Sequence, residues 1–261
     1  MVWRVSRQLD AALAGRVLTR SDFRVPRFAT TDLTGRSVRQ ALSRGKHTLI
    51  RVDGALTIHT HLRMDGSWRI RPAGRFPPGD HRVRLVLENA QWQAAGYRLG
   101  LVEVLPTARE DRAIGHLGPD LLGPDWDPAE AVRRLRATPE RPIGEALLDQ
   151  RNLAGIGNVY KAEVLFLRGV SPWQPAGQAG ELEPLVDLAR RLLEANKERI
   201  GQVTTGNPAR GQETWVYGRA GRPCRRCGTT ILADGYAGRG GPAQERVTFW
   251  CPACQPGPDS A

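Results

Sequence analysis

The chain has 261 residues, 40% of them hydrophobic, and is therefore long enough to form two domains with apolar cores. No apolar run approaches the roughly 20 residues that cross a bilayer, and residues 1–7 lack the apolar stretch of a secretory signal. We therefore expect a cytoplasmic protein with no membrane partner.

The formal net charge of +11 is concentrated at the two ends of the chain. Residues 1–106 carry a net charge of +10 and residues 215–254 carry +4, whereas residues 107–214 carry −2. A polyanion is the natural partner of such a protein, and nucleic acid is favoured over a membrane because no basic amphipathic helix carries the charge. An arginine-rich genome is the alternative explanation, but codon bias should not spare the middle segment.

Only three of the 38 basic residues are lysines, namely Lys46, Lys161 and Lys197. Arginine keeps its proton in proteins, whereas lysine can lose it. These three positions are therefore candidates for chemistry, although most such lysines are ordinary solvated surface residues.

The N-terminal segment is predicted to be a helix followed by strands. Apolar residues recur on one helical face from Val2 to Leu13, and Gly15 ends the pattern, which predicts a helix over 2–14. A strand pattern then continues to about Leu105. Asp53-Gly54 predicts a hairpin turn between two strands. The predicted strands cover 47–52, 56–62, 67–71, 81–88 and 97–104, in a β-rich domain spanning 1–106.

The second half is predicted to be helical. Residues 107–127 are rich in Gly, Pro and Asp and are predicted to be a linker. Asp127-Pro128 is typical of a helix start, with an N-cap followed by proline in the first turn. Further helices are predicted near 143–149, 158–168 and 181–200, within a domain spanning 128–214. A cysteine-rich segment, 215–255, and a disordered tail, 256–261, complete the chain.

All four cysteines lie in two Cys-x-x-Cys pairs separated by 23 residues. Each pair can form a tight turn that supplies two thiolates, so two pairs fit one tetrahedral Zn²⁺ ion. Two disulfides or a redox pair are the alternatives, but nothing suggests secretion or a surrounding βαβ pattern. We predict one structural zinc ion that folds a β-hairpin, bound by Cys224, Cys227, Cys251 and Cys254.

The residues between the two cysteine pairs indicate what the hairpin presents. Residues 244–250 are predicted to be a strand in which Arg246 and Thr248 point to one side and Val247 and Phe249 to the other. Arg246 could therefore face a nucleic-acid backbone or groove. The stretch from Asp234 to Gly241 is predicted to form a mobile hairpin tip.

A second motif is the turn Gly155-Ile156-Gly157-Asn158 between two predicted helices. Asn158 is a suitable N-cap, and Gly155 and Gly157 would let backbone N–H groups approach a bound group at the positive end of the new helix. The motif predicts a phosphate site. A helix-turn-helix joint with glycines needed only for steric reasons is the alternative.

Together these segments resemble the Fpg/Nei family of DNA glycosylases, which excise oxidised bases. The resemblance covers nearly the whole chain and is carried, in the family's order, by residues 43–47, 61–69, 117–120, 152–158, 216–219, 223–228 and 246–255. It implies an α+β protein: an N-terminal β-sandwich with a leading helix, then a C-terminal helix-two-turn-helix domain ending in a zinc β-hairpin.

The resemblance also implies the chemistry. Members bind double-stranded DNA, extrude the damaged nucleotide and attack C1′ of its sugar with an amine, which forms an imine and leads to strand cleavage. Lys46 corresponds to the family's conserved strand lysine, Asn158 to its phosphate-gripping asparagine and Arg246 to its zinc-finger arginine. Met64 lies where the family inserts a side chain into the space left by the extruded base. We expect a nucleoid-associated monomer.

The sequence departs from the family at its start. The family's catalytic amine belongs to an N-terminal proline followed by a glutamate, whereas this chain begins Met1-Val2-Trp3. Either the natural start lies upstream, which we favour because Lys46, Asn158 and Arg246 are all present, or the protein is an inactive binder of damaged DNA. As written, the 261-residue chain is predicted to form no imine. A zinc-ribbon RNA-binding protein is a more distant alternative.

Two features favour the endonuclease VIII (Nei) branch of the actinobacterial type. The loop 201–214 is short for the purine-excising branch, which caps 8-oxoguanine with a longer loop there. Trp68 also resembles the Nei pattern. We therefore expect oxidised pyrimidines and abasic sites to be preferred substrates.

Overall fold

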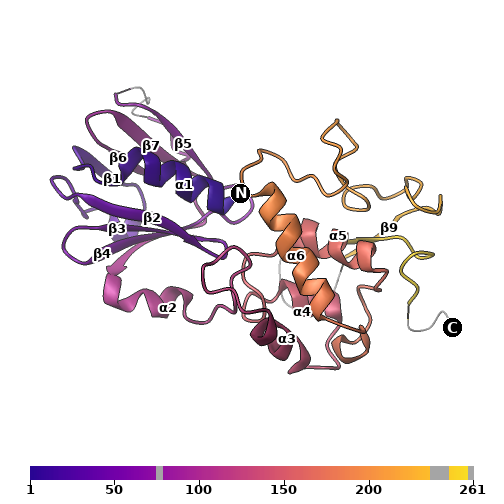
Figure 1. The fold of residues 1–261 in the computed structure, drawn as a ribbon. Helices are drawn as coiled ribbons and strands as arrows, with labels where there is room; N and C mark the ends of the chain where they lie inside the picture. Colours follow the sequence, from indigo (N-terminus) through magenta and orange to yellow (C-terminus); the bar gives the residue numbers. More distant parts are fainter. Residues whose placement is uncertain (75–78, 236–246, 258–261) are drawn as a thin grey trace. The chain divides into compact units, whose positions relative to one another are not determined.

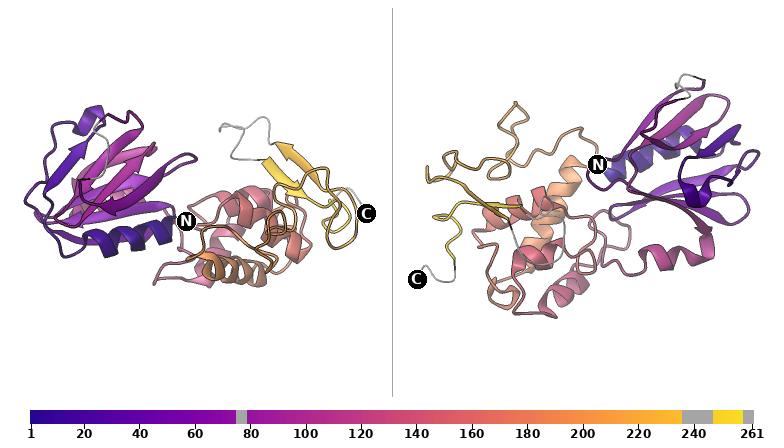
Figure 2. Two further views of the ribbon diagram at one scale, coloured as in Figure 1. Left: turned by 90° about the horizontal axis from the view of Figure 1, so that it is seen from above. Right: turned by 180° about the vertical axis from the view of Figure 1, so that it is seen from behind.

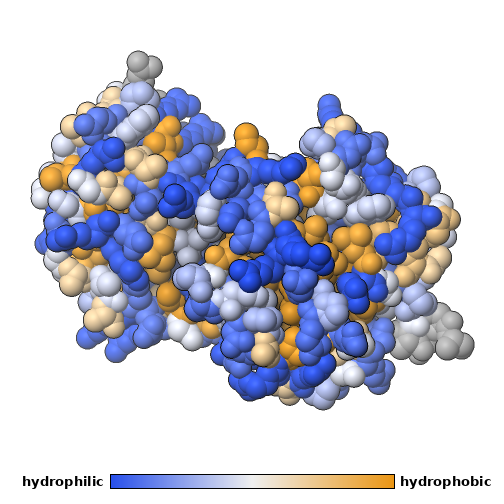
Figure 3. All heavy atoms as spheres, in the orientation of Figure 1, coloured by the Kyte–Doolittle hydropathy of each residue, from blue (hydrophilic) through white to orange (hydrophobic). Residues whose placement is uncertain are grey.

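The computed structural model describes residues 1–74, 79–235 and 247–257 and divides into two compact units, Met1–His116 and Leu117–Ala261 (Figure 1). Hydrophilic side chains cover most of the face of each unit shown in Figure 3. Within the described ranges, no helix combines the length and apolar character required to span a membrane.

The N-terminal unit is a β-sandwich with a leading helix, as predicted. Helix α1 (Val2–Leu13) contacts strands of both sheets (Figure 1). One antiparallel sheet has the strand order β2-β3-β4-β8 and the other has the order β1-β6-β7-β5. The strands are β1 (Arg20–Phe23), β2 (Val38–Arg44), β3 (His47–Val52), β4 (Leu56–His61), β5 (Ser67–Pro72), β6 (Val83–Glu88), β7 (Trp92–Tyr97) and β8 (Leu101–Pro106), with a 3-10 turn, η1 (Pro26–Phe28), after β1.

The two sheets enclose one apolar core. Alternate residues of β3, β4 and β8 point inward and meet those of β6, β7 and α1, because successive side chains of a strand lie on opposite faces. The buried residues include Leu9, Leu13, Ile50, Ile58, Leu85, Leu87, Ala94 and Val102. The other face of β3 and β4 is polar and is reached by the segment after β8. There Glu110 accepts hydrogen bonds from Arg51 and Thr57.

Strands β1, β2 and β7 are absent from the list of predicted strands, and two further details differ from the sequence prediction. The single strand predicted over 97–104 is two strands, because the chain leaves one sheet after Tyr97 and enters the other at Leu101. Arg98 adopts φ +47°, and Leu99 is buried in the core at this corner. Part of the segment predicted as a linker is helical, with η2 (Thr107–Arg109) and α2 (Glu110–Ile114).

The C-terminal unit begins with a helical bundle. It contains α3 (Pro128–Arg136), α4 (Ile143–Leu148), α5 (Asn158–Arg168), η3 (Ala176–Gln178) and α6 (Glu183–Asn196). The Asp127 side chain accepts a hydrogen bond from the Glu130 N–H at 3.0 Å, so the predicted cap of α3 is confirmed. A continuous apolar core joins the helices and includes Leu135, Leu147, Leu165, Val186 and the turn residue Ile156.

The cysteine segment packs on this bundle. Strands β9 (Leu232–Gly235) and β10 (Val247–Trp250) pair antiparallel, with Leu232 opposite Trp250, and lie beside the helices in Figure 2. Gly218, Gly221 and Gly228 have φ between +69° and +78°, so they allow the chain to turn around the cysteine pairs. Arg246, the predicted hairpin tip beyond Gly235 and residues 258–261 of the predicted tail lie outside the described residues.

Candidate metal centre and nucleic-acid interface

The four cysteines converge at one point. Their sulfur atoms all lie within 4.8 Å of one another, and none forms a disulfide. A tetrahedral Zn²⁺ with Zn–S bonds of about 2.3 Å would hold its sulfurs about 3.8 Å apart. The Sγ atoms of Cys224 and Cys254 are 4.0 Å apart, and Cys227 Sγ is 3.5 Å from those of Cys251 and Cys254. The cluster therefore has the dimensions of a metal site.

Hydrogen bonds and a small apolar cluster attach the cysteine segment to the helices. Phe166 of α5 packs with Val216, Ile231 and the buried cysteines. Gln255 accepts a hydrogen bond from the Cys251 N–H at 3.1 Å and donates to the Val170 carbonyl at 2.9 Å. The cysteine cluster is thus fixed to the end of α5 by groups other than the cysteine thiols.

The turn before α5 is held internally by Gln150, which sequence reasoning missed. Gly155 has φ +98°, and its N–H donates to the Gln150 side-chain oxygen at 3.0 Å. The Gln150 amide donates to the Ile156 carbonyl at 3.1 Å. The backbone N–H of Gly155 is therefore already used within the protein and is not free to hold a bound group.

The predicted N-cap role of Asn158 is wrong. Gly157 occupies the cap position, and Asn158 is the first residue of α5. The Asn158 side chain instead donates to the Val247 carbonyl of β10 at 2.7 Å, because the hairpin brings an acceptor to it that local sequence does not reveal. The first turn of α5 consequently has no side-chain cap, and its positive end is available to an outside anion.

Two charged side chains are completely buried on α5. The Lys161 ammonium donates to Thr248 Oγ1 of β10 at 2.8 Å, and burial lowers the pKa of this lysine to about 7. Glu163 accepts hydrogen bonds from the backbone N–H groups of Trp215, Val216 and Tyr217 at 2.7, 2.9 and 2.9 Å. The Thr204 hydroxyl donates to the same carboxylate.

These two residues tie the hairpin and the segment leading to it onto one helix. The scarcity of lysine had marked Lys161, whereas Glu163 was missed. The sequence does contain an indication of its burial, because Glu163 is the only polar residue in the apolar run from Ala162 to Leu167.

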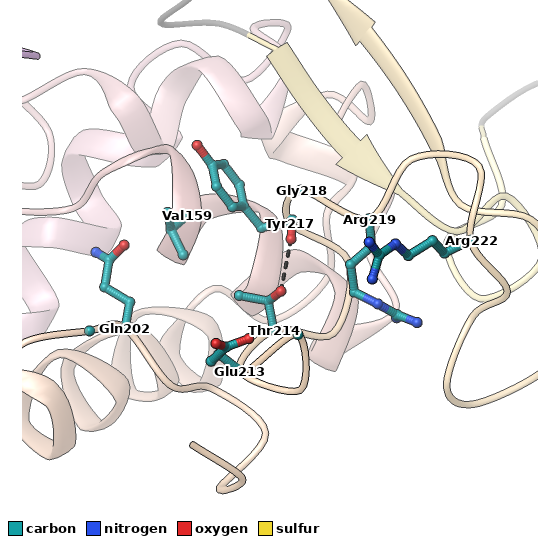
Figure 4. Close-up of a pocket in the computed structure, with 10 residues that line it drawn as sticks. Val159, Gln202, Glu213, Thr214, Tyr217, Gly218, Arg219 and Arg222 are labelled. Atoms are coloured by element: carbon teal, nitrogen blue, oxygen red, sulfur yellow. Dashed lines mark hydrogen bonds between the residues drawn. The ribbon is translucent and has the colours of Figure 1, made fainter. Parts of the chain in front are cut away.

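A pocket of about 380 Å³ lies beside the start of α5 (Figure 4). The predicted short loop lines it, together with Tyr217, whose carbonyl accepts a hydrogen bond from the Thr214 hydroxyl at 2.8 Å. Arg219 is mostly buried and donates to the carbonyls of Trp215 and Pro223, so its role is to hold this loop. The lining includes Val159, Gln202, Glu213 and Arg222. The mixture of amide, carboxylate and guanidinium groups suits a polar ligand.

In the N-terminal unit, Lys46 lies in the two-residue turn between β2 and β3, where Gly45 adopts φ +56°. Histidines gather around its neighbour His47, a feature that sequence reasoning missed. The ring centroids of His47 and His59 are 4.9 Å apart, with His47 Nδ1 2.7 Å from His59 Nε2, and the rings of His61 and His116 lie 4.8 and 6.2 Å from His47. The strand register could have indicated this grouping, because His47 pairs with His61 across β3 and β4.

Met64 lies in the turn between β4 and β5 and is 65% exposed, so it does not fill the core. Arg63 before it has φ +51°, and the Gly66 N–H closes the turn on the Leu62 carbonyl at 3.0 Å. An exposed apolar side chain on a tight turn is suited to insert between bases.

Both units match one protein family. Residues 2–98 match the formamidopyrimidine-DNA glycosylase N-terminal domain, and residues 117–204 match the formamidopyrimidine-DNA glycosylase H2TH domain. The chain therefore belongs to the formamidopyrimidine-DNA glycosylase and endonuclease VIII (Fpg/Nei) family.

Within that family the chain fits the endonuclease VIII branch. It is 58% identical to "Probable endonuclease 8 2" of Streptomyces coelicolor, covering 98% of this chain and 93% of that protein. It is 50% identical to "DNA-(apurinic or apyrimidinic site) lyase Nei2" of Mycolicibacterium smegmatis, covering 97% and 96% of the two. A crystal structure of the Lactococcus lactis formamidopyrimidine-DNA glycosylase bound to DNA containing an AP site has a TM-score of 0.81 at 26% identity, covering 98% of both chains.

Proposed function

We propose that this protein is a base-excision-repair DNA glycosylase with AP lyase activity, acting on double-stranded DNA that contains oxidised bases or abasic sites. The observation that carries the proposal is similarity over almost the full chain to proteins named endonuclease 8 and DNA-(apurinic or apyrimidinic site) lyase. Such an enzyme works as a monomer on chromosomal DNA, in the nucleoid.

The described side chains support named roles in that reaction. The Lys46 ammonium stabilises departing groups and exchanges protons at the sugar. Asn158 and the uncapped start of α5 bind a phosphate beside the lesion. Met64 fills the space that the extruded base leaves. Arg246 binds phosphates from the hairpin. The family's amine nucleophile, an N-terminal proline, and its partner glutamate are not among the first residues of this sequence.

The proposed metal is one structural Zn²⁺. A four-thiolate site has no open coordination position, so the metal would fold the hairpin rather than take part in the reaction. When bound, it would hold the two cysteine pairs together and fix β10 beside α5.

Oxidised pyrimidines are the proposed base substrates. The short loop and Tyr217 line a pocket beside the start of α5. The polar groups of this pocket support recognition of an extruded nucleotide there. A loop of this length leaves less surface to enclose a purine.

Strand cleavage of defined duplexes tests the proposal. The protein should carry its natural N-terminus, established by sequencing protein from its own host. We expect cleavage at an abasic site, covalent trapping by borohydride, and faster excision of thymine glycol than of 8-oxoguanine. Tight binding to an abasic analogue without trapping or cleavage would overturn the enzymatic proposal, and faster excision of 8-oxoguanine would reverse the substrate preference.

A further inference from the structure

The short loop beside the pocket of Figure 4 has two arms, residues 201–205 and residues 211–214. The first arm is tied to α6, because Asn196 accepts a hydrogen bond from the Val203 N–H at 2.7 Å and donates to the Val203 carbonyl at 2.9 Å. Residues 206–212 are exposed, so burial contributes little to the position of the second arm. The second arm therefore needs a support of its own.

Arg225 supplies that support with its whole guanidinium group. Its Nε donates to the Thr214 carbonyl at 3.1 Å, one terminal nitrogen donates to the Gly211 carbonyl at 2.6 Å, and the other donates to the Gln212 side-chain oxygen. The three nitrogens of one planar group thus bind three residues of the second arm. Lysine has a single nitrogen on a flexible chain and cannot reproduce this fork.

The backbone of Arg225 belongs to the turn of the first cysteine pair, between Cys224 and Cys227. In this turn the Arg226 N–H donates to Cys224 Sγ at 3.4 Å, and the Gly228 N–H donates to the Cys224 carbonyl at 2.9 Å. These bonds and the proposed zinc ligands hold the turn from which the guanidinium extends. One arm of the loop is consequently attached to α6 and the other to the cysteine turn.

The second arm forms part of the pocket wall. Gly211, Glu213 and Thr214 line the pocket, whereas Arg225 does not. The Glu213 carbonyl accepts a hydrogen bond from the Thr204 N–H at 2.8 Å, so the Glu213 side chain in Figure 4 starts from the point where the two arms join. A displacement of about 1 Å in groups that orient a substrate can lower a rate by a factor on the order of 100.

We propose that Arg225 is a positioning residue that fixes the second arm to the cysteine turn and thereby sets the shape of the pocket for an extruded base. This inference rests on the proposed function, in which the pocket recognises an extruded nucleotide. Arg225 acts through residues 211–214 rather than on the DNA. An abasic site has no base to place in the pocket, so the anchored arm is needed to excise a base and not to cleave at a site that already lacks one.

The first test measures the anchor in the free protein. The Arg225 Nε–H resonance, assigned by its loss in Arg225→Lys, should exchange slowly with solvent in the unaltered protein, because this N–H is bonded to a carbonyl. Arg225→Lys and Arg225→Met should both accelerate amide hydrogen exchange at Thr204 and Gln212, whose N–H groups donate within the loop. A rapidly exchanging Arg225 Nε–H, or unchanged exchange at both amides in the variants, would overturn the proposal.

The second test compares substrates, using protein with its natural N-terminus. Arg225→Met should lower excision of thymine glycol from duplex DNA by about tenfold or more and leave cleavage at a preformed abasic site nearly unchanged. Arg225→Lys keeps the charge and should show the same split, because the loss is one of geometry. The preference for thymine glycol over 8-oxoguanine should also decrease in both variants, since a released arm no longer limits the size of the base.

Arg226→Met is the matched control. Arg226 is the next residue of the same turn and carries the same charge, but its guanidinium lies over the Phe166 ring, 4.6 Å from the centroid. This variant should affect base excision and abasic-site cleavage equally.

Equal losses on the two substrates in both Arg225 variants, or losses that only follow the zinc content or the melting temperature, would show a structural role and contradict the proposal. If the unaltered protein cleaves neither substrate, the proposed function is refuted, and the exchange measurements still decide whether Arg225 anchors the loop.

Discussion

The β-sandwich and the cysteine hairpin are stabilised by different kinds of interaction. The sandwich has an apolar core built from both sheets and α1, so many side chains each contribute a little. The hairpin has only a small apolar cluster and depends on four thiolates and on polar anchors from α5. Stability is therefore distributed in one region and concentrated in a few groups in the other, and single changes should have very different effects.

Removal of the proposed zinc ion should have the largest effect. Cys224→Ser, or chelation, removes a site whose binding free energy is about 10 kcal/mol or more in small zinc domains. We expect one equivalent of zinc in the purified protein, loss of protease resistance around residues 215–235 after chelation, and a severe loss of DNA affinity. Thermal unfolding of the sandwich should change little. Equal loss of structure in both units would contradict the comparison.

Glu163→Gln should be the next most damaging change. The amide offers one oxygen in place of a carboxylate that receives three backbone N–H groups. Because the buried N–H groups of residues 215–217 lose a charged acceptor, we expect a loss of about 3 kcal/mol or more in the stability of the C-terminal unit. Hydrogen exchange at residues 215–217 should accelerate. Glu194→Gln is the matched control, since Glu194 pairs with Lys197 at a more exposed site and should matter far less.

Lys161→Met should act through pH. The pKa of Lys161 is lowered from 10.5 to about 7, so between these pH values the unfolded chain binds a proton that the folded chain does not. The free energy of unfolding therefore rises with pH across this window in the unaltered protein. The variant lacks that rise, so its stability relative to the unaltered protein should be greatest below pH 7. Above pH 7, the free energy of unfolding of the variant minus that of the unaltered protein should decrease by up to about 1.4 kcal/mol per pH unit.

Denaturant unfolding between pH 6 and pH 10 measures this difference. Lys197→Met provides the comparison, because that lysine is not fully buried. A difference between the Lys161 variant and the unaltered protein that does not change with pH would mean that Lys161 keeps an ordinary pKa.

A sandwich substitution should have the smallest effect. Ile50 is completely buried between the sheets, and Ile50→Val removes one methylene group from a core of many side chains. We expect a loss of about 1 kcal/mol in the stability of the N-terminal unit. Calorimetry should show an unchanged transition for the C-terminal unit. A much larger loss would mean that the sandwich, too, depends on a few residues.

The features that the sequence predicted correctly are mostly those that depend on residues close together in the chain. Local patterns located α1, the hairpin at Asp53-Gly54 and the cap at Asp127, because neighbouring residues determine each of them. The cysteine spacing predicted the cluster for a different reason, because two Cys-x-x-Cys pairs are the ligand pattern of a tetrahedral zinc site. The corner at Arg98 was missed, because the apolar pattern continues through it while the chain changes sheets.

Long-range partners account for the errors at the site. Asparagine is a common N-cap residue, yet the side-chain amide of Asn158 donates a hydrogen bond to the carbonyl of Val247, 89 positions away. The contacts of His59 with Glu103 and His47, at 2.6 and 2.7 Å, depend on the register of three strands, which spacing along the chain does not reveal. Sequence therefore predicted local structure better than it predicted contacts between distant residues.

The carboxylate of Glu163 gives the hairpin a property that a metal alone would not. Three successive N–H groups converging on one point form a nest of the kind that binds phosphate in other proteins. Here the nest is permanently occupied by an anion that belongs to α5 itself. Phosphates, which surround a DNA-binding protein at work, cannot displace a built-in counter-ion. The connection between helix and hairpin should therefore keep the same geometry in salt, on DNA and during transfer between sites.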